Sequence, residues 1–137
     1  MEAVVQSFMA GFPVLMLHSS VTLAILAIAV FVYIKITPYD EIALIKDGNT
    51  AAALSLAGAI VGFSLPLAFA MASSITVYEV LIWGPVTLLL QLIAFRITDV
   101  LLSDLPKRIV NGEMGPAIFL VSIKIAVAAI NAAAVTG

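Results

Sequence analysis

Lys124 is the residue of this sequence whose type and position most clearly suggest chemistry. It lies inside an apolar run near the C-terminus, about ten residues in, or roughly 15 Å deep if the run is a membrane helix. A Lys at the centre of a bilayer costs about 2.5–3.5 kcal/mol on insertion scales, and charges inside membranes usually mark functional sites. Snorkelling of the long side chain toward an interface is the structural alternative.

Polar residues at helical spacing predict neighbours for Lys124. Thr87 and Gln91 lie in the preceding apolar run, and Asn131 follows Lys124 on the same helical face. No acid lies in the middle of an apolar run, so a charged Lys124 would need neutral oxygens, water, a bound anion or a neighbouring subunit. These residues indicate a path for an anion or polar solute. Interhelical hydrogen bonds, worth about 0.6 kcal/mol each, are the alternative for the uncharged ones.

Other candidates have simpler explanations. His18 could relay protons, but a lone His without acidic neighbours is more typical of a hydrogen-bonded packing residue. The acids near the presumed cytoplasmic ends of the runs, Glu41 and Asp99 among them, are explained by capping and by pairing with nearby basic residues. The sequence has no cysteine and no metal-ligand cluster, nucleotide loop or nucleophile–base pair. We therefore expect no metal, no cofactor and no enzymatic activity.

The elements that must position these side chains are membrane helices. Hydrophobic residues make up 64% of the 137 residues and charged residues 10%, against about 25% charged in a soluble domain. The apolar runs are continuous and about 20 residues long, which predicts helices rather than barrel strands. With a net charge of −2, nucleic acid is not an expected partner. The fold class is an all-α integral membrane protein with four spans, near residues 13–36, 49–72, 78–98 and 115–135.

The first connection contains a capping pattern. We interpret Thr37 as a helix N-cap, Pro38 as the first helical residue and Asp40 as the capping-box acid. Gly48 after Asp47 is a typical helix stop, and Asn49 can cap the second span. These residues predict a short helix at the membrane surface, and residues 103–112 predict a second one in the third connection.

The two longer connections match at a shift of 64 residues. Asp40 then falls on Asp104, Ile45 on Ile109 and Gly48 on Gly112. We predict that a helical hairpin occurs twice, as residues 13–72 and 77–136 of a single membrane domain. Both copies run the same way through the membrane, which predicts a pseudo-twofold axis along the membrane normal.

The same residues carry a resemblance to a known family. The chain resembles the YjfL-like small bacterial inner-membrane proteins, which contain the domain of unknown function three-fifty. The resemblance covers nearly the whole chain and implies a four-helix inner-membrane protein with two related halves, without an established activity. Gly112-Glu113 departs from the Gly-Asn expected in the second half. The matching stretches are Thr37-Pro38-Tyr39-Asp40-Glu41, Lys46-Asp47-Gly48-Asn49, Ala57-Gly58 with Gly62, Trp83-Gly84, Gln91 and Asn131-Ala132-Ala133.

Small residues predict close helix packing. Ser55, Gly58 and Gly62 share one face of the second span, and Gly84 lies in the third. Small side chains let helix backbones approach closely inside a bilayer. The partner of the Gly58–Gly62 face can be a helix of the same chain or of another copy. Four short helices enclose little room, so a pore would need several copies, and we expect a homo-oligomer.

Basic residues predict the orientation. Apart from Lys124, every Lys and Arg belongs to the first or third connection, which the positive-inside rule places in the cytoplasm. We expect a multi-pass protein of a bacterial inner membrane with both termini outside. Its expected function is an oligomeric channel or transporter subunit for a small polar or anionic solute. The alternative is a non-catalytic scaffold that docks a cytoplasmic protein, as in an envelope-stress assembly.

Overall fold

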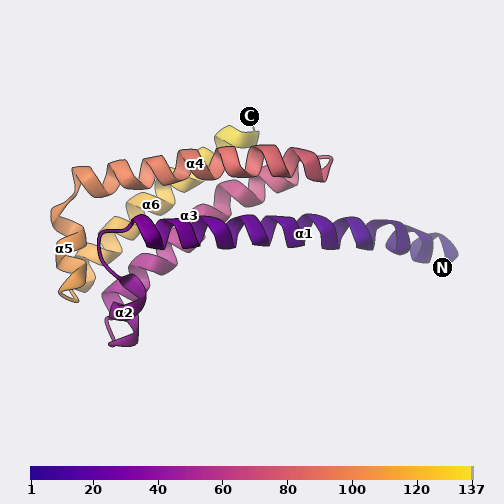
Figure 1. Ribbon diagram of the computed structural model, residues 1–137. Coiled ribbons are helices and arrows are strands. Elements are labelled where there is room, and N and C mark those ends of the chain that lie inside the picture. The colour runs from indigo at the N-terminus through magenta and orange to yellow at the C-terminus, as the bar shows by residue number, and fades with distance from the viewer. Residues whose placement is uncertain (137) are drawn as a thin grey trace.

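The computed structural model describes residues 1–136, which are helical apart from the short connections (Figure 1). Four long helices, α1 (Glu2–Ile36), α3 (Thr50–Ser73), α4 (Val77–Leu101) and α6 (Met114–Thr136), are each long and apolar enough to cross a bilayer. Two short helices, α2 (Glu41–Lys46) and α5 (Asp104–Val110), occupy the longer connections. The predicted all-α class and the four spans are confirmed.

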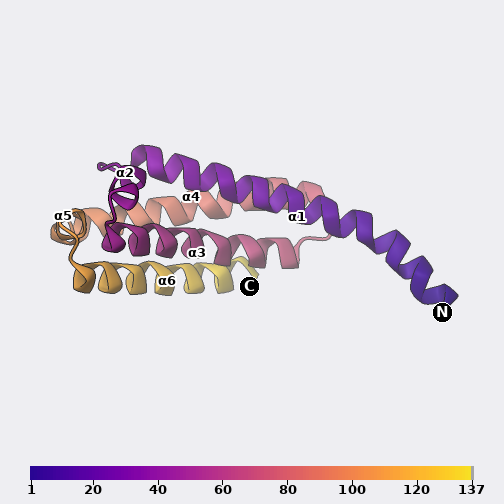
Figure 2. The same ribbon diagram turned by 90° about the horizontal axis from the view of Figure 1, so that it is seen from below.

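The first helix is longer than predicted. It begins at Glu2 rather than near Pro13 and contains 35 residues. Pro13 removes one backbone hydrogen bond, whereas the residues before it include good helix formers such as Glu2, Ala3 and Gln6. The helix is about 52 Å long at 1.5 Å per residue, against about 30 Å of hydrocarbon core. Its N-terminal end extends beyond the other helices (Figure 2).

The caps of the first connection differ in part from the prediction. Asp40, not Thr37, is the N-cap of α2, and its carboxylate accepts a 3.1 Å hydrogen bond from the Ala43 backbone N–H. Thr37 instead ends α1, where its hydroxyl donates to the Tyr33 carbonyl at 2.7 Å. Pro38 lies before the helix, because the residue that precedes a proline avoids the helical region and Thr37 is extended.

The two short helices end in the same way. Gly48 and Gly112 both have positive φ, at 88° and 82°, a conformation that favours glycine. Gly48 N–H bonds the carbonyl of Ile45, and Gly112 N–H bonds that of Ile109. Asn49 caps α3 as predicted, accepting from Ala52 N–H at 3.0 Å. Its amide also donates to the carbonyls of Ile109 and Val110, both at 3.1 Å, and so joins the two connections.

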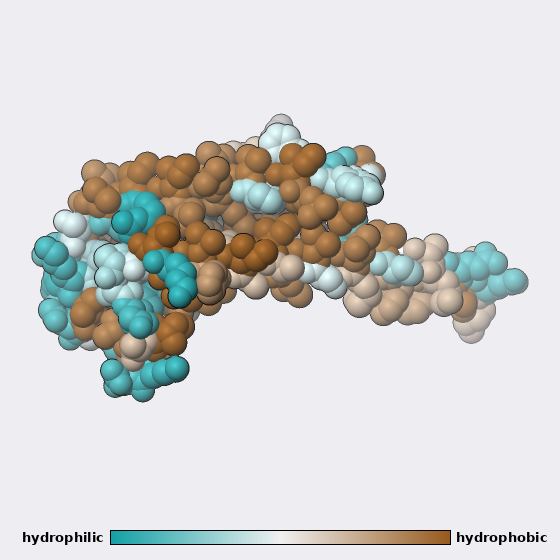
Figure 3. All heavy atoms as spheres, viewed as in Figure 1, coloured by the Kyte–Doolittle hydropathy of each residue, from teal (hydrophilic) through white to brown (hydrophobic). Residues whose placement is uncertain are grey.

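The bundle is built around α3. It packs most extensively against α6 and also contacts α4 and α1, whereas α1 lies at the periphery with most of its residues exposed. Hydrophobic residues cover most of the visible surface of the long helices, and hydrophilic residues gather at the end that carries α2 and α5 (Figure 3). An apolar surface of this kind suits contact with lipid.

Small residues on α3 make this packing close. A Cβ atom added at Gly58 would lie 2.6 Å from Val121 of α6, and one added at Gly62 would lie 2.5 Å from Phe95 of α4. Both glycines are buried, as is Ser55. The Gly58–Gly62 face therefore packs inside this chain. Gly84 of α4 has Ile25 and Leu67 as its neighbours.

Candidate functional site

Lys124 is buried in the bundle with an acidic partner. Its side chain is 1% exposed, and its ammonium lies 3.0 Å from Asp99 Oδ1 and donates a 2.9 Å hydrogen bond to the Tyr33 hydroxyl. Our expectation that a charged Lys124 has no acid of its own chain as a partner is therefore wrong. Snorkelling of the amine to lipid headgroups is excluded too, because the side chain is buried. Asp99 also lies 3.9 Å from Arg96, as expected from their spacing on α4.

The pairing depends on the antiparallel course of α4 and α6. Side chains on a helix lean toward its N-terminus. The N-terminus of α6 lies at the end that carries α5, so Lys124 leans toward that end. The N-terminus of α4 lies at the opposite end, so Asp99 leans into the bundle. The two side chains thus converge, although counting residues from the ends of their helices places them at different depths.

An aromatic wall surrounds the ammonium group. Lys124 Nζ lies 5.2 Å from the ring centroids of both Tyr33 and Phe95. Phe63 packs against the same two rings, with centroids 5.7 Å and 5.0 Å away. Aromatic faces attract cations, and more strongly where water is excluded. These rings therefore both desolvate and stabilise the charge.

Glu41, which its position in the first connection suggested to be a capping or paired acid, is a second acid of this cluster. Its side chain is fully buried, and neither carboxylate oxygen has a hydrogen-bond partner among the described residues. Burial raises its pKa to about 7, opposed by the positive charge of Lys124 and assisted by the negative charge of Asp99. Burial also raises the pKa of nearby Tyr39. Glu41 can therefore gain or lose a proton near neutral pH.

Gln91 and Asn131 form a separate polar pair between α4 and α6. Asn131 donates a 2.8 Å hydrogen bond to Gln91 Oε1, while Gln91 Nε2 is buried without a partner in the described chain. Thr87, one turn away on α4, is 2% exposed. The interhelical hydrogen bond that was the alternative for these residues is thus present between Gln91 and Asn131. Lys124 binds Asp99 and Tyr33 instead.

A groove opens beside each polar pair. One, of about 520 Å³, lies at the end that carries α2 and α5, and Asp99 contributes to its wall with Arg96 and Lys107. The other, of about 290 Å³, is lined by Trp83, Thr87, Leu90, Asn131, Ala134 and others on α4 and α6. Two polar pairs, each beside its own groove, therefore follow one another along the bundle.

His18 lies apart from these groups. It is half-buried on α1, and its carbonyl, not its ring, accepts a 2.6 Å hydrogen bond from Thr22. Glu79, near the start of α4, accepts from the Ile75 backbone N–H at 2.9 Å. The structure gives His18 no part in the polar cluster. Within residues 1–136, no group of three or more His, Cys, Asp or Glu residues could hold a metal ion.

Comparison with known proteins settles the family. A family model described as Domain of Unknown Function (DUF350) matches residues 7–135. The chain belongs to the DUF350 family. It is 33% identical over 113 residues to the inner membrane protein YjfL (UPF0719) of Escherichia coli K12, covering 82% of this chain and 86% of that protein, and it matches the protein of the same name from E. coli O157:H7 equally well. No solved structure matches this chain.

Membership in the DUF350 family agrees with the resemblance carried by the Asp47-Gly48-Asn49 stretch. Together with the four apolar helices, the inner-membrane relatives show a multi-pass inner-membrane protein. In the second half of this DUF350 chain, Glu113 occupies the place of Asn49. It forms a 2.9 Å ion pair with Arg108, which is a local contact within the turn after α5. The two connections therefore differ in what they join.

Proposed function

We propose that this DUF350 protein is a non-catalytic transport subunit, a channel or transporter, that passes a small polar or anionic solute along its α4–α6 seam. The buried Lys124–Asp99 pair is the observation that carries the proposal. Buried ion pairs add little net stability compared with apolar packing. A charge kept inside a membrane therefore favours a functional explanation.

The arrangement of the polar pairs supports a path. An anion entering from the groove beside Asp99 first meets the positive charges of Arg96 and Lys107. It can then compete with Asp99 for Lys124. Gln91 and Asn131 supply amide donors further along, next to the second groove. Lys124 is 1% exposed, so passage requires the helices to move or several copies to assemble around the seam.

The test removes both charges together, because removing one leaves its partner unpaired. Breaking a buried pair from one side costs about 3–5 kcal/mol, so Lys124→Met alone could unfold the bundle. Lys124→Met/Asp99→Asn removes both charges of the ion pair together, and the volume is largely kept. We expect purified protein in liposomes to release at least one of chloride, inorganic phosphate and glycerol, and the double variant to do so at least tenfold more slowly.

A matched control removes two exposed charges elsewhere at the same end. Lys46 and Arg108 are exposed on α2 and α5, so Lys46→Gln/Arg108→Gln should release the probes at the wild-type rate. Wild-type release by Lys124→Met/Asp99→Asn, or no release above empty liposomes for any of the three probes, would overturn the transport proposal.

The scaffold alternative is favoured by one specific contact. The Asn49 amide fastens the start of α3 to the carbonyls of Ile109 and Val110 at the end of α5, which gives the α2–α5 end a fixed surface rich in charged residues. A cytoplasmic protein could dock there. If Asn49→Ala abolishes the cellular function while Lys124→Met/Asp99→Asn preserves it, docking rather than transport is the role.

We also propose the orientation and the repeat. Lys35, Lys46, Arg96, Lys107 and Arg108 lie in the part of the chain near α2 and α5, which supports a cytoplasmic location for that end. The matching turns at Gly48 and Gly112 support two related hairpins. The packing is less regular than a pseudo-twofold axis requires, since α4 packs well on α3 whereas α1 packs little on α6.

A further inference from the structure

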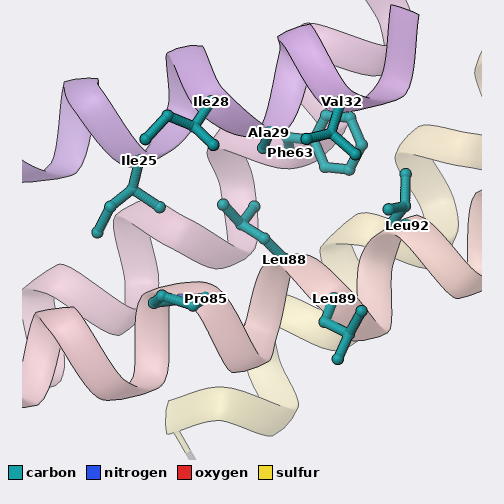
Figure 4. Close-up of a pocket in the computed structure, with 9 residues that line it drawn as sticks. All are labelled: Ile25, Ile28, Ala29, Val32, Phe63, Pro85, Leu88, Leu89 and Leu92. Atoms are coloured by element: carbon teal, nitrogen blue, oxygen red, sulfur yellow. The ribbon is translucent and has the colours of Figure 1, made fainter. Parts of the chain in front are cut away.

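A groove with a wholly different character runs along the other side of α4. It lies between α1 and α4, with Phe63 of α3 at its floor, and has a volume of about 250 Å³ (Figure 4). Ile25, Ala29 and Val32 of α1 and Pro85, Leu89 and Leu92 of α4 line it, and its wall is apolar. From Pro85 to Leu92 it extends about 10 Å along α4.

The apolar groove is followed by the charged one along the same seam. Leu89 and Leu92 are succeeded on α4, at intervals of three or four residues, by Arg96 and Val100 of the groove beside Asp99. Such intervals keep residues on one helical face. On α1, Val32 of the first groove is followed by Thr37 of the second. From Leu92 to Arg96 the rise is about 6 Å.

Charge in the second groove favours an anion. Arg96 and Lys107 line it, and Arg96 is about one-third exposed, with only a long 3.9 Å contact to Asp99. The negative charge of Asp99 is already matched by Lys124 at 3.0 Å. Two cations thus remain for an incoming group, and Arg and Lys bind phosphate oxygens through charge-assisted hydrogen bonds.

We propose that the α1–α4 seam is a binding site for one anionic phospholipid. An acyl chain fills the groove lined by Ala29 and Leu89, and the headgroup phosphate contacts Arg96 and Lys107. The apolar part lies within the spanning segments, and the cations lie where α4 approaches the end of the bundle, as the two parts of a lipid require. The headgroup part of this site shares Arg96 and Lys107 with the entry groove of the proposed transport path, but lipid binding depends neither on transport nor on the orientation of the chain.

The test compares phosphatidylglycerol with phosphatidylcholine in nanodiscs that hold the full chain. We expect the protein to retain phosphatidylglycerol, as detected by native mass spectrometry, with at least tenfold preference over phosphatidylcholine. Arg96→Gln/Lys107→Gln should abolish this preference, since each cation near an anionic lipid surface contributes about fivefold in affinity. Lys46→Gln/Arg108→Gln removes two charges from the same end outside the groove and should leave the preference intact.

The apolar part has its own pair of variants. Ala29→Phe fills the groove, whereas Ala27→Phe adds the same ring to an exposed position of the same helix. Only Ala29→Phe should reduce phosphatidylglycerol retention. Inorganic phosphate added to phosphatidylcholine nanodiscs should not appear as mass bound to the protein. If it does, the groove holds a free anion and the lipid proposal fails.

A second copy of the chain is the competing occupant. If Ala29→Phe dissociates an oligomer and leaves lipid retention unchanged, the seam is a protein interface. Equal retention of both lipids by the wild type would also overturn the proposal. Each of these readings uses bound mass and not solute release, so a failed transport proposal would not be mistaken for a failed lipid site.

Discussion

At the scale of single residues, the cluster at Lys124 is defined by its charges. One ammonium lies near two acids, Asp99 and Glu41, and only Asp99 lies within ion-pair distance of it. If both acids are ionised, the buried cluster carries a net negative charge, whereas a protonated Glu41 makes it neutral. A low-dielectric interior favours the neutral form. The protonated form of Glu41 therefore suits the packed bundle. Loss of this proton leaves a net negative charge in the cluster, which destabilises the packing.

Protonation of Glu41 predicts a pH-dependent stability. Its pKa is about 7 in the folded chain, above the ordinary value of 4.5. Between these values the unfolded chain loses this proton while the folded chain keeps it, so stability falls as pH rises from about 5 to 7.5, by up to roughly 3 kcal/mol. Thermal unfolding in detergent at several pH values should show this fall. Glu41→Gln should flatten it, and a curve unchanged by that substitution would contradict the assignment.

At the scale of elements, α3 organises the bundle through its small residues. Its glycines let α6 and α4 approach until Val121 and Phe95 fill the space above Gly58 and Gly62. The approach of α4 and α6 to the same helix positions Asp99 and Lys124 to meet. The small-residue face thus supports the polar cluster as well as the packing. In a bilayer such close packing is the main attraction between helices, because lipid supplies no hydrophobic drive.

A Cβ at residue 58 should disturb this packing. Gly58→Ala places a carbon 2.6 Å from both Cγ atoms of Val121, and overpacking of this kind costs about 1–3 kcal/mol. We expect a lower melting temperature in detergent for Gly58→Ala and recovery when Val121→Ala is added. Gly115→Ala is the matched control, since nothing lies within 4 Å of its added Cβ. A Gly58→Ala protein as stable as this control would show that α3 and α6 are less closely packed than described.

At the scale of the whole molecule, the chain combines two similar connections with an asymmetric polar interior. A shift of 64 residues relates Gly48 to Gly112, but it pairs Lys124 with Ile60 and Gln91 with Ala27. Both polar pairs therefore lie within the second hairpin. Tyr33 and Glu41 of the first hairpin complete the cluster around Lys124. An asymmetric interior of this kind is consistent with one polar path per chain along the α4–α6 seam.

Topology is the prediction for the whole chain. Reporters fused after residue 137 should be active outside the cytoplasm, and reporters inserted near Asp47 should be active inside, because the Lys and Arg residues outside the spans lie near α2 and α5. Paired alkaline phosphatase and green fluorescent protein fusions measure this directly. The reverse pattern would place the groove beside Asp99 outside the cell and would invert the direction of the proposed path.

The sequence by itself determined the class, the number of spans, the family and the caps at Asn49 and Gly48, because hydropathy and capping act over a few neighbouring residues. It also singled out Lys124 as a candidate site, because a Lys inside a long apolar run is costly in a bilayer, but it left snorkelling open. Only the tertiary structure decided its partners. Asp99 and Glu41 look like surface acids in the sequence, and they join Lys124 because antiparallel helices aim their side chains at one another and α2 folds Glu41 against the bundle. Contacts of this kind depend on the relative offset of helices, which local sequence patterns do not encode.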